Sequence, residues 1–251
     1  MNVHQLDKLS DYVQYLQKNP NEVNVLFREL LIGVTSFFRD AEAFDELKTH
    51  IAAMLTDKPR GYTIRTWIPG CASGEEAYSV AMILTECIEE LKKHAHIQIF
   101  ATDIDEPAIE KAREGVFPAS VAEDVGSERL RKYFIKAENA FRIRPDIREA
   151  IVFALQDVIK DPPFTKLDLL SCRNLLIYFD DDLQRRLLPV FHYALRPGGL
   201  LLLGPSESIG SFDDLFAPVN KKWKVYRRKE GPTRALPELP RAPDEGGRRA
   251  R

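Results

Sequence analysis

One stretch of the sequence, WIPGCASGEEAYS at residues 67–79, restricts the fold more than any other part of the chain. An apolar segment runs into small residues between Gly70 and Gly74, and an amphipathic pattern starts at Glu75 and Glu76. This is typical of a strand, a tight turn and a helix N-terminus. Such a turn lets a ligand approach the backbone closely, and the free N–H groups of the helix start face the same place. The stretch predicts a nucleotide-binding type of α/β sheet.

The charges around this turn indicate the kind of ligand. A phosphate-binding loop usually avoids carboxylates or offsets them with a lysine, but Glu75 and Glu76 have no lysine beside them. We therefore expect a ligand that is neutral or cationic and rich in hydroxyls, such as a nucleoside. An NAD-dependent dehydrogenase is a poor alternative, because residue 72 is alanine and the G-x-G-x-x-G pattern is missing.

Apolar strands alternate with helical patterns along the chain. The predicted strands are residues 62–68, 97–101, 151–155, 167–171 and 200–204, with a final antiparallel strand at 219–228. Polar residues follow the strand ends, namely Asp103, Asp157 and Asn174 in addition to the Glu pair. In a doubly wound, mostly parallel sheet these residues line one edge. We expect Asp103 to face the ligand and Asp105 to cap the next helix.

The domain organisation follows from the same patterns. Residues 1–34 form a short helical part, with a helix at 6–18 and a second helix that closes at Gly33. Residues 35–60 are a linker and a helix. Residues 61–229 form the main domain, with a small insertion at about 115–150 where the strand and helix alternation is lost. Residues 230–251 combine prolines with charges and are predicted to be a disordered tail.

Composition excludes several classes of function. The 251 residues contain 36 Lys and Arg against 38 Asp and Glu, so a nucleic-acid partner is not supported. The basic run at 221–229 favours a solvated edge strand. The three cysteines are too scattered for a disulfide framework or a zinc site. We find no signal peptide and no apolar run near 18 residues, which predicts a cytoplasmic location without direct membrane insertion.

Four segments in this order resemble the chemotaxis receptor methyltransferases, the CheR family: TSFFRD (35–40), GCASGEEAYSVAM (70–82), ATDID (101–105) and CRNLLIYFD (172–180). The similarity covers about residues 6–228. It implies a class I S-adenosylmethionine-dependent methyltransferase fold, with LRPGGLLLLG (195–204) similar to that superfamily. It also implies that S-adenosylmethionine donates a methyl group to glutamate side chains on the cytoplasmic helices of chemoreceptors, leaving S-adenosylhomocysteine.

The resemblance implies a set of cofactor-binding positions in this chain. They are Thr35, Arg39, Gly70, Glu75, Glu76, Asp103, Asp157, Val158, Asn174, Leu175 and Tyr178. Asp103 matches the acid that binds the ribose, and Asp157 and Val158 match the positions that hold the adenine edge. Glu76 matches a carboxylate near the methionine or ribose part, whereas Glu75 is a neighbour that alternatively serves the helix start.

Two of these positions are the predicted catalytic residues, Arg39 and Tyr178. Thr35 and Arg39 match linker residues that reach over the cofactor, and Asn174 and Leu175 match the loop beside the sulfonium and amino-acid part. A glutamate carboxyl has a pKa of about 4.3, so the acceptor is already a nucleophile at neutral pH and needs neither a general base nor a metal. Arg39 could orient that carboxylate, and Tyr178 could donate a hydrogen bond near the methyl group.

Departures from the family pattern leave two questions open. Only about 34 residues precede Thr35, and Gly33 stands where some members have Asn. We therefore expect a segment of a multidomain fusion, whose other domains are its partners. The short segment at 136–140 lacks the Gly-containing loop of members that dock on a receptor's C-terminal pentapeptide, which predicts a pentapeptide-independent enzyme. The alternative is a non-catalytic module that senses S-adenosylmethionine or S-adenosylhomocysteine.

Overall fold

A computed structural model of the protein describes residues 9–19, 22, 26 and 35–231. The chain divides into two compact units, residues 1–34 and residues 35–251. In the first unit, α1 (Leu9–Lys18) is followed by Asn19, whose side chain donates a hydrogen bond of 2.9 Å to the Tyr15 carbonyl. Most of the predicted second helix up to Gly33 and nearly all of the predicted tail lie outside the described residues. None of the described helices is both long and apolar enough to span a membrane.

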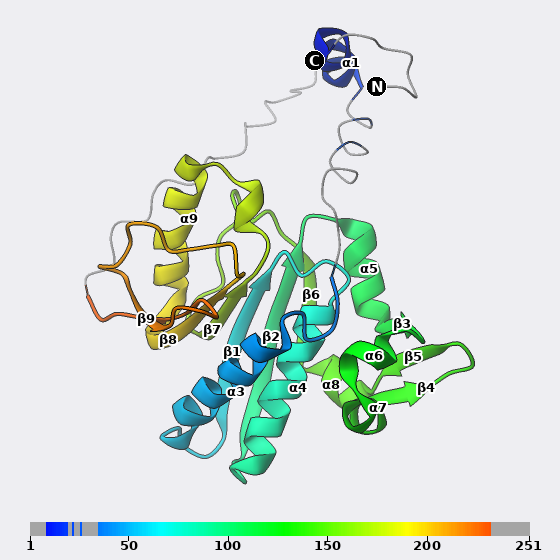
Figure 1. Cartoon of the computed structure of the whole chain (residues 1–251), viewed down its shortest axis with the longest axis vertical. Coiled ribbons are helices and arrows are strands. Elements are labelled where there is room, and N and C mark those ends of the chain that lie inside the picture. Colours follow the sequence, from blue (N-terminus) through cyan, green and yellow to red (C-terminus); the bar gives the residue numbers. More distant parts are fainter. Residues whose placement is uncertain (1–8, 20–21, 23–25, 27–34, 232–251) are drawn as a thin grey trace, which may run out of the picture. The chain divides into compact units, whose positions relative to one another are not determined.

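The described residues of the second unit form a seven-stranded sheet with the strand order β6-β2-β1-β7-β8-β10-β9 (Figure 1). Its strands are β1 (Tyr62–Pro69), β2 (Ala95–Asp103), β6 (Ile151–Leu155), β7 (Leu167–Cys172), β8 (Leu195–Leu203), β9 (Phe216–Asn220) and β10 (Val225–Arg228). The first five strands in this order pair in parallel, whereas β10 is antiparallel to both β8 and β9. The predicted doubly wound, mostly parallel sheet with an antiparallel last strand is confirmed.

Residues 216–228 form a hairpin of β9 and β10, so the prediction of one strand at 219–228 is wrong. The turn between β9 and β10 is closed by the Asn220 side chain, which accepts a hydrogen bond of 3.0 Å from the Trp223 N–H. Lys224 then adopts a positive φ of 54°, which completes the reversal. An Asn side chain that bonds to a backbone two or three residues ahead is a turn signal, and the high β-propensity of the neighbouring residues hides it.

The start of β8 also differs from the prediction, which placed a turn at 196–199 and the strand at 200–204. The strand begins at Leu195, and its pairing with β7 shifts register between Leu167 and Leu169. A Cβ at Gly199 would lie 2.9 Å from the Arg196 carbonyl oxygen. Gly199 therefore permits an irregularity inside the strand, where the local sequence favours a turn.

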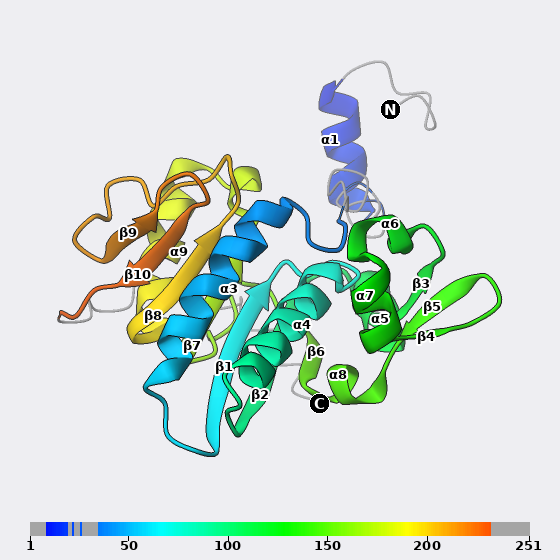
Figure 2. The ribbon, with the colours of Figure 1, turned by 60° about the horizontal axis from the view of Figure 1, so that its bottom comes forward.

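Helices cover both faces of the sheet (Figures 1 and 2). The helices are α3 (Ala41–Thr56), α4 (Glu75–Glu90), α5 (Glu106–Glu114), α6 (Val121–Val125), α7 (Ser127–Tyr133), α8 (Pro145–Glu149), the 3₁₀ turn η2 (Leu176–Tyr178) and α9 (Asp181–Ala194). Figure 2 shows α3 and α4 side by side over one face, where they share a core cluster with Ile64 and Ile68 of β1. The helix α9 packs in a second cluster with Trp67. The single strand β1 serves both clusters because successive side chains point to opposite faces.

A small subdomain lies between α5 and β6, in the part of the sequence without regular alternation. It contains a three-stranded antiparallel sheet with the order β3-β5-β4, together with α6 and α7. Its strands are β3 (Val116–Pro118), β4 (Phe134–Lys136) and β5 (Ala140–Ile143). The helix α8 then leads the chain back into the large sheet at β6.

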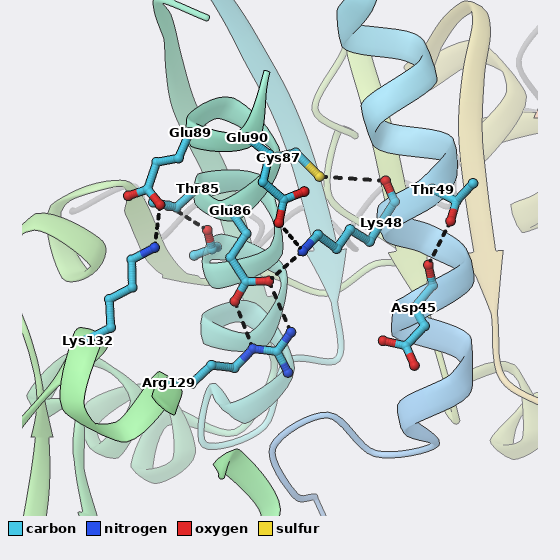
Figure 3. Close-up of polar contacts among 11 residues, drawn as sticks. Asp45, Lys48, Thr49, Thr85, Glu86, Cys87, Glu89, Glu90, Arg129 and Lys132 are labelled. Atoms are coloured by element: carbon cyan, nitrogen blue, oxygen red, sulfur yellow. Dashed lines mark hydrogen bonds and ion pairs between the residues drawn. The ribbon is translucent and has the colours of Figure 1, made fainter. Parts of the chain in front are cut away.

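Ion pairs tie this subdomain to the main sheet through α4 (Figure 3). Glu86 of α4 accepts a hydrogen bond of 2.8 Å from Arg129 of α7 and one of 3.2 Å from Lys48 of α3. Lys132 of α7 pairs with Glu89 one turn further on. Burial opposes ionisation of Glu86, but the two basic partners outweigh it and lower the pKa of its carboxyl. One carboxylate thus joins three helices from separate parts of the chain.

A second polar cluster lies at the amino ends of the strands, opposite the loop after β1. Asp168, buried at the start of β7, accepts hydrogen bonds from the Tyr62 hydroxyl and from the Arg65 N–H, the latter at 2.9 Å. Arg196 of β8 lies 3.5 Å from the same carboxylate. Burial and the adjacent Asp168 raise the pKa of Tyr62 to about 12. The cluster joins the starts of β1, β7 and β8.

Candidate functional site

The candidate site lies at the carboxyl ends of the parallel strands, where the strand order reverses between β1 and β7. Open α/β sheets bind their ligands at such a switch point. The segments that meet there are the loop after β1 at 70–74, the end of β2, the loop after β7 at 173–178 and the turn after β8 at 204–207. The structure brings the predicted residues Gly70, Glu76, Asp103 and Asn174 to this edge, because Asp103 ends β2 and the other three lie in the loops or the helix start that follow β1 and β7.

The loop after β1 needs small residues at specific points. Gly70, Ala72 and Gly74 all have positive φ, at 71°, 45° and 93°. A Cβ at Gly70 would lie 3.1 Å from the Leu175 side chain, and one at Gly74 would lie 3.0 Å from the Ala112 Cβ. The turn is therefore packed closely against the loop after β7 on one side and against α5 on the other. Glycine at 70 and 74 permits both approaches.

Asp103 ties this loop to the neighbouring strand. Its carboxylate accepts a hydrogen bond of 2.8 Å from the Ala72 N–H and one of 3.0 Å from the Asp105 N–H. Each of its oxygens keeps a further lone pair for another donor. Asp105 occupies the position before α5 but makes no side-chain capping hydrogen bond, so the expectation that it caps this helix is wrong. The N–H of Asp105 serves Asp103 instead.

The two carboxylates at the start of α4 have different environments. Glu75 accepts hydrogen bonds from the Ser73 hydroxyl, the shorter at 2.8 Å, and burial raises the pKa of its carboxyl. Glu76 accepts a hydrogen bond of 2.7 Å from Ser171 of β7 and lies 3.6 Å from Nη1 of Arg173. Burial raises the pKa of Glu76 as well, against the opposing effect of Arg173 and Ser171. Glu76 thus faces the switch point, and Glu75 bonds within its own turn.

The segment TSFFRD is anchored to the same region. The Phe38 N–H donates a hydrogen bond of 3.0 Å to Ser79 of α4, and the Phe37 ring packs edge-on against Phe117 and Phe134 of the small subdomain. Thr35 and Arg39 are half-buried, and the backbone at Asp40 has a positive φ of 60°. Phe37 and Phe38 both belong to the first core cluster, and the Phe38 ring packs edge-on against Phe44 of α3.

The loop after β7 is held by a carboxylate that the sequence reasoning missed. Glu207 is 4% exposed and accepts three backbone hydrogen bonds, from Gly204 at 2.6 Å, from Leu176 at 2.7 Å and from Asn174 at 3.1 Å. Asn174 has a positive φ of 57°, so the chain reverses sharply at this point. The only sequence signal for Glu207 is an acidic residue in a short turn directly after a buried strand.

The remaining predicted residues lie further out. Tyr178, in the short turn η2, is 45% exposed. Asp157 follows β6 and bonds within its own loop, accepting from the Ile159 N–H at 2.9 Å and pairing with Lys160 at 2.8 Å. Val158 packs beside the second core cluster.

Arg173 is a second residue that the sequence reasoning missed, although it lies inside the segment CRNLLIYFD. Its side chain is 1% exposed, and Nη2 donates to the Arg39 carbonyl at 2.8 Å and to the Asp40 carboxylate at 2.6 Å. A basic residue next to a strand end is by itself usually a surface residue, so its sequence context gives no sign of this burial.

The strand order and the position of the site define a class I S-adenosylmethionine-dependent methyltransferase fold. Residues 33–225 match the family described as "CheR methyltransferase, SAM binding domain". The chain therefore belongs to the CheR methyltransferase family, and its cofactor is S-adenosylmethionine.

Relatives align with this protein along most of the chain. An uncharacterized 104.1 kDa protein of Rhodobacter capsulatus is 40% identical over 228 residues, which cover 90% of this chain and 24% of that protein. The chemotaxis protein methyltransferase 2 of Vibrio cholerae is 34% identical, covering 82% of this chain and 73% of the relative. A chemotaxis protein methyltransferase of Borreliella burgdorferi is 31% identical, covering 80% and 74%. The chain thus spans about a quarter of the first relative and most of the other two.

Proposed function

We propose that this protein transfers the methyl group of S-adenosylmethionine to glutamate side chains of chemoreceptor cytoplasmic helices, without a pentapeptide tether. The products are glutamyl methyl esters and S-adenosylhomocysteine, and the site of action is the cytoplasm. The proposal is supported by the family and by relatives that are named chemotaxis protein methyltransferases. The observation that carries it is the cluster at the switch point, where Glu76, Ser171 and Arg173 lie against the segment that contains Arg39.

The chemistry of the edge fits this cofactor, which has a positive sulfur, an ammonium group, a carboxylate and ribose hydroxyls, but no phosphate. Two carboxylates, Glu75 and Glu76, occupy the first turn of α4, where they would repel a phosphate and attract a cation. Asp103 retains acceptor lone pairs that would suit ribose hydroxyls. We assign Asp103 to the ribose and Glu76 to the methionine part.

The other cofactor positions remain part of the proposal. Gly70, Asn174 and Leu175 border the close approach of two loops, which suits contact with the sulfonium and amino-acid part. Asp157 and Val158 stand at the end of β6 for the adenine edge. Because the Asp157 carboxylate already pairs with Lys160, an adenine amino group would have to share that oxygen or bond to its neighbour.

The bound cofactor supplies an electrophilic methyl group on a sulfonium. The chain's own residues would then only orient the acceptor carboxylate and keep water away from it, which is the main source of rate in such a displacement. Arg39 would bind that carboxylate through its planar guanidinium. Tyr178 would donate a hydrogen bond from its exposed position, where a protein substrate can reach it. Thr35 would close the cofactor from the side of the linker.

The turn between β4 and β5 supports pentapeptide independence. Three residues, 137–139, connect the strands, and the Ala137 N–H donates a hydrogen bond of 2.8 Å to the Ala140 carbonyl across the turn. This turn is too tight to carry a Gly-containing loop of the kind that tethered members have. We also propose that the domain works inside a larger protein, which is supported by its match to about a quarter of the Rhodobacter relative.

The test is transfer of a labelled methyl group to membranes enriched in chemoreceptor. We expect base-labile ester formation that is equal for receptors with and without the C-terminal pentapeptide. Tight cofactor binding without any ester would refute the proposed activity and favour the sensing module. Ester formation only with the pentapeptide would refute the untethered mode alone.

A further inference from the structure

The side chain of Arg173 is the most unusual polar group in the described part of the chain. It is 1% exposed, yet it carries a permanent charge and lies directly beside the switch point of the sheet. Its Nε and Nη1 atoms are buried and have no hydrogen-bond partner among the described residues. A buried guanidinium with unused donors is costly to stability, so packing alone does not account for an arginine at this position.

The contacts of Arg173 join four segments. Nη2 donates to the Arg39 carbonyl and to the Asp40 carboxylate on one side of the fork, and Nη1 lies 3.6 Å from the Glu76 carboxylate on the other side. The guanidinium also sits 5.3 Å from the centre of the Phe44 ring in α3, within the range of a cation–π contact. The two edges of one planar group therefore hold the linker segment and the start of α4 at a set distance.

We propose that Arg173 is a positioning residue that holds Arg39 and Glu76 in the arrangement that binds the cofactor. This inference rests on the proposed roles of Arg39 and Glu76 in cofactor binding and does not depend on the identity of the methyl acceptor. Arg173 acts through its partners: it fixes the backbone at Arg39 through the carbonyl and the neighbouring Asp40, and it balances the charge of Glu76.

The geometry explains why lysine would not replace this arginine. A lysine ammonium is a single point of charge, so it can approach either the Asp40 side or the Glu76 side, but it cannot bridge both as a fork does. The Arg173→Lys variant therefore keeps the positive charge and loses the bridge. Asp40, on the exposed side of the network, is a second position at which the network can be tested by substitution. Its positive φ is compatible with both Gly and Asn.

The experiment is a calorimetric titration of the full chain with S-adenosylhomocysteine. We expect Arg173→Lys to weaken binding about tenfold, the size of a coupling through one shared network. Asp40→Gly, which removes the acceptor, should weaken binding in the same direction. Asp40→Asn keeps an acceptor oxygen and should bind within about threefold of the wild type. Arg185→Lys, in an exposed ion pair with Asp182, is the matched control and should bind as the wild type does.

The double variant separates positioning from a general structural effect. If Asp40 acts through Arg173, the double variant should lose less affinity than the sum of the losses in Arg173→Lys and Asp40→Gly, whereas a loosened linker would add its own loss in full. Additive losses, or Arg173→Lys binding as tightly as the wild type, would overturn the inference. If Arg173→Lys does not fold, the Asp40→Gly and Asp40→Asn pair decides, and equal affinity of these two variants overturns it.

The outcome is independent of the proposed substrate. Binding of S-adenosylhomocysteine requires no methyl acceptor, so a wild-type chain that binds it but forms no glutamyl ester refutes the proposed activity and leaves the role of Arg173 intact. An Arg173→Lys variant that forms the ester normally and binds S-adenosylhomocysteine with unchanged affinity overturns the role of Arg173 and leaves the proposed activity intact.

Discussion

Replacing Glu207 with glutamine exchanges one carboxylate oxygen for an NH₂ group and should destabilise the protein markedly. The Glu207 carboxylate is buried and accepts three backbone hydrogen bonds, two on Oε2 from Gly204 and Asn174 and one on Oε1 from Leu176. A glutamine side chain has one acceptor oxygen and one donor group. In the better of its two orientations, the oxygen keeps the Gly204 and Asn174 pair, and the amide NH₂ faces the Leu176 N–H.

The cost follows from these contacts. The two retained hydrogen bonds change from charge-assisted to neutral, which weakens each by about 1 kcal/mol. The Leu176 N–H, which is buried, loses its partner and meets another donor, at a cost of about 1–3 kcal/mol. We expect a total loss of about 3–5 kcal/mol in the free energy of unfolding. The other amide orientation would satisfy the Leu176 N–H but leave the N–H groups of Gly204 and Asn174 without an acceptor, so it does not lower the cost.

Chemical denaturation of the wild type and of Glu207→Gln measures this loss directly. Glu110→Gln, on the exposed side of α5, is the matched control and should change the free energy of unfolding by less than about 0.5 kcal/mol. A Glu207→Gln protein that unfolds within about 0.5 kcal/mol of the wild type would refute the argument. The same variant should bind S-adenosylhomocysteine more weakly, since the backbone at Asn174 borders the site.

Further outcomes are expected at the site and away from it. Gly74→Ala should destabilise the fold by about 2 kcal/mol, against about 1 kcal/mol for Gly210→Ala, because both have positive φ but only Gly74 is tightly packed; equal losses in denaturation would refute the packing argument. Asp103→Ala should weaken S-adenosylmethionine binding in calorimetry, and normal affinity would remove Asp103 from the ribose. Arg39→Ala should lower turnover more than cofactor affinity, and a loss of affinity alone would make Arg39 a binding residue. Because folding raises the pKa of Tyr62, the neutral Tyr62 hydroxyl contributes fully to the free energy of unfolding below pH 10.0. That contribution is lost as the pH rises through about 12. Tyr62→Phe should therefore flatten the pH dependence of unfolding in this range, and an unchanged slope would contradict the assignment.

Much of the fold follows from local patterns in the sequence. Strands such as β8 contain a continuous apolar run, Leu200–Leu203, because both faces of a parallel sheet are covered. The turn at 70–74 carries glycine where the backbone requires a positive φ. Periodicity and φ preference are properties of neighbouring residues, so the alternation of strands and helices, the fold class and the edge that carries the site are predicted without coordinates. The individual roles of the cofactor positions remain predictions.

The tertiary structure alone decided which groups meet. Arg173 contacts Asp40, 133 residues earlier in the chain, and Glu207 bonds to Leu176, 31 residues before it. Such partners depend on the order of strands in the sheet, and no local window of sequence reports that order. The sequence by itself determined the fold class and the edge that carries the site, and the packing of distant segments decided which buried charges support that edge.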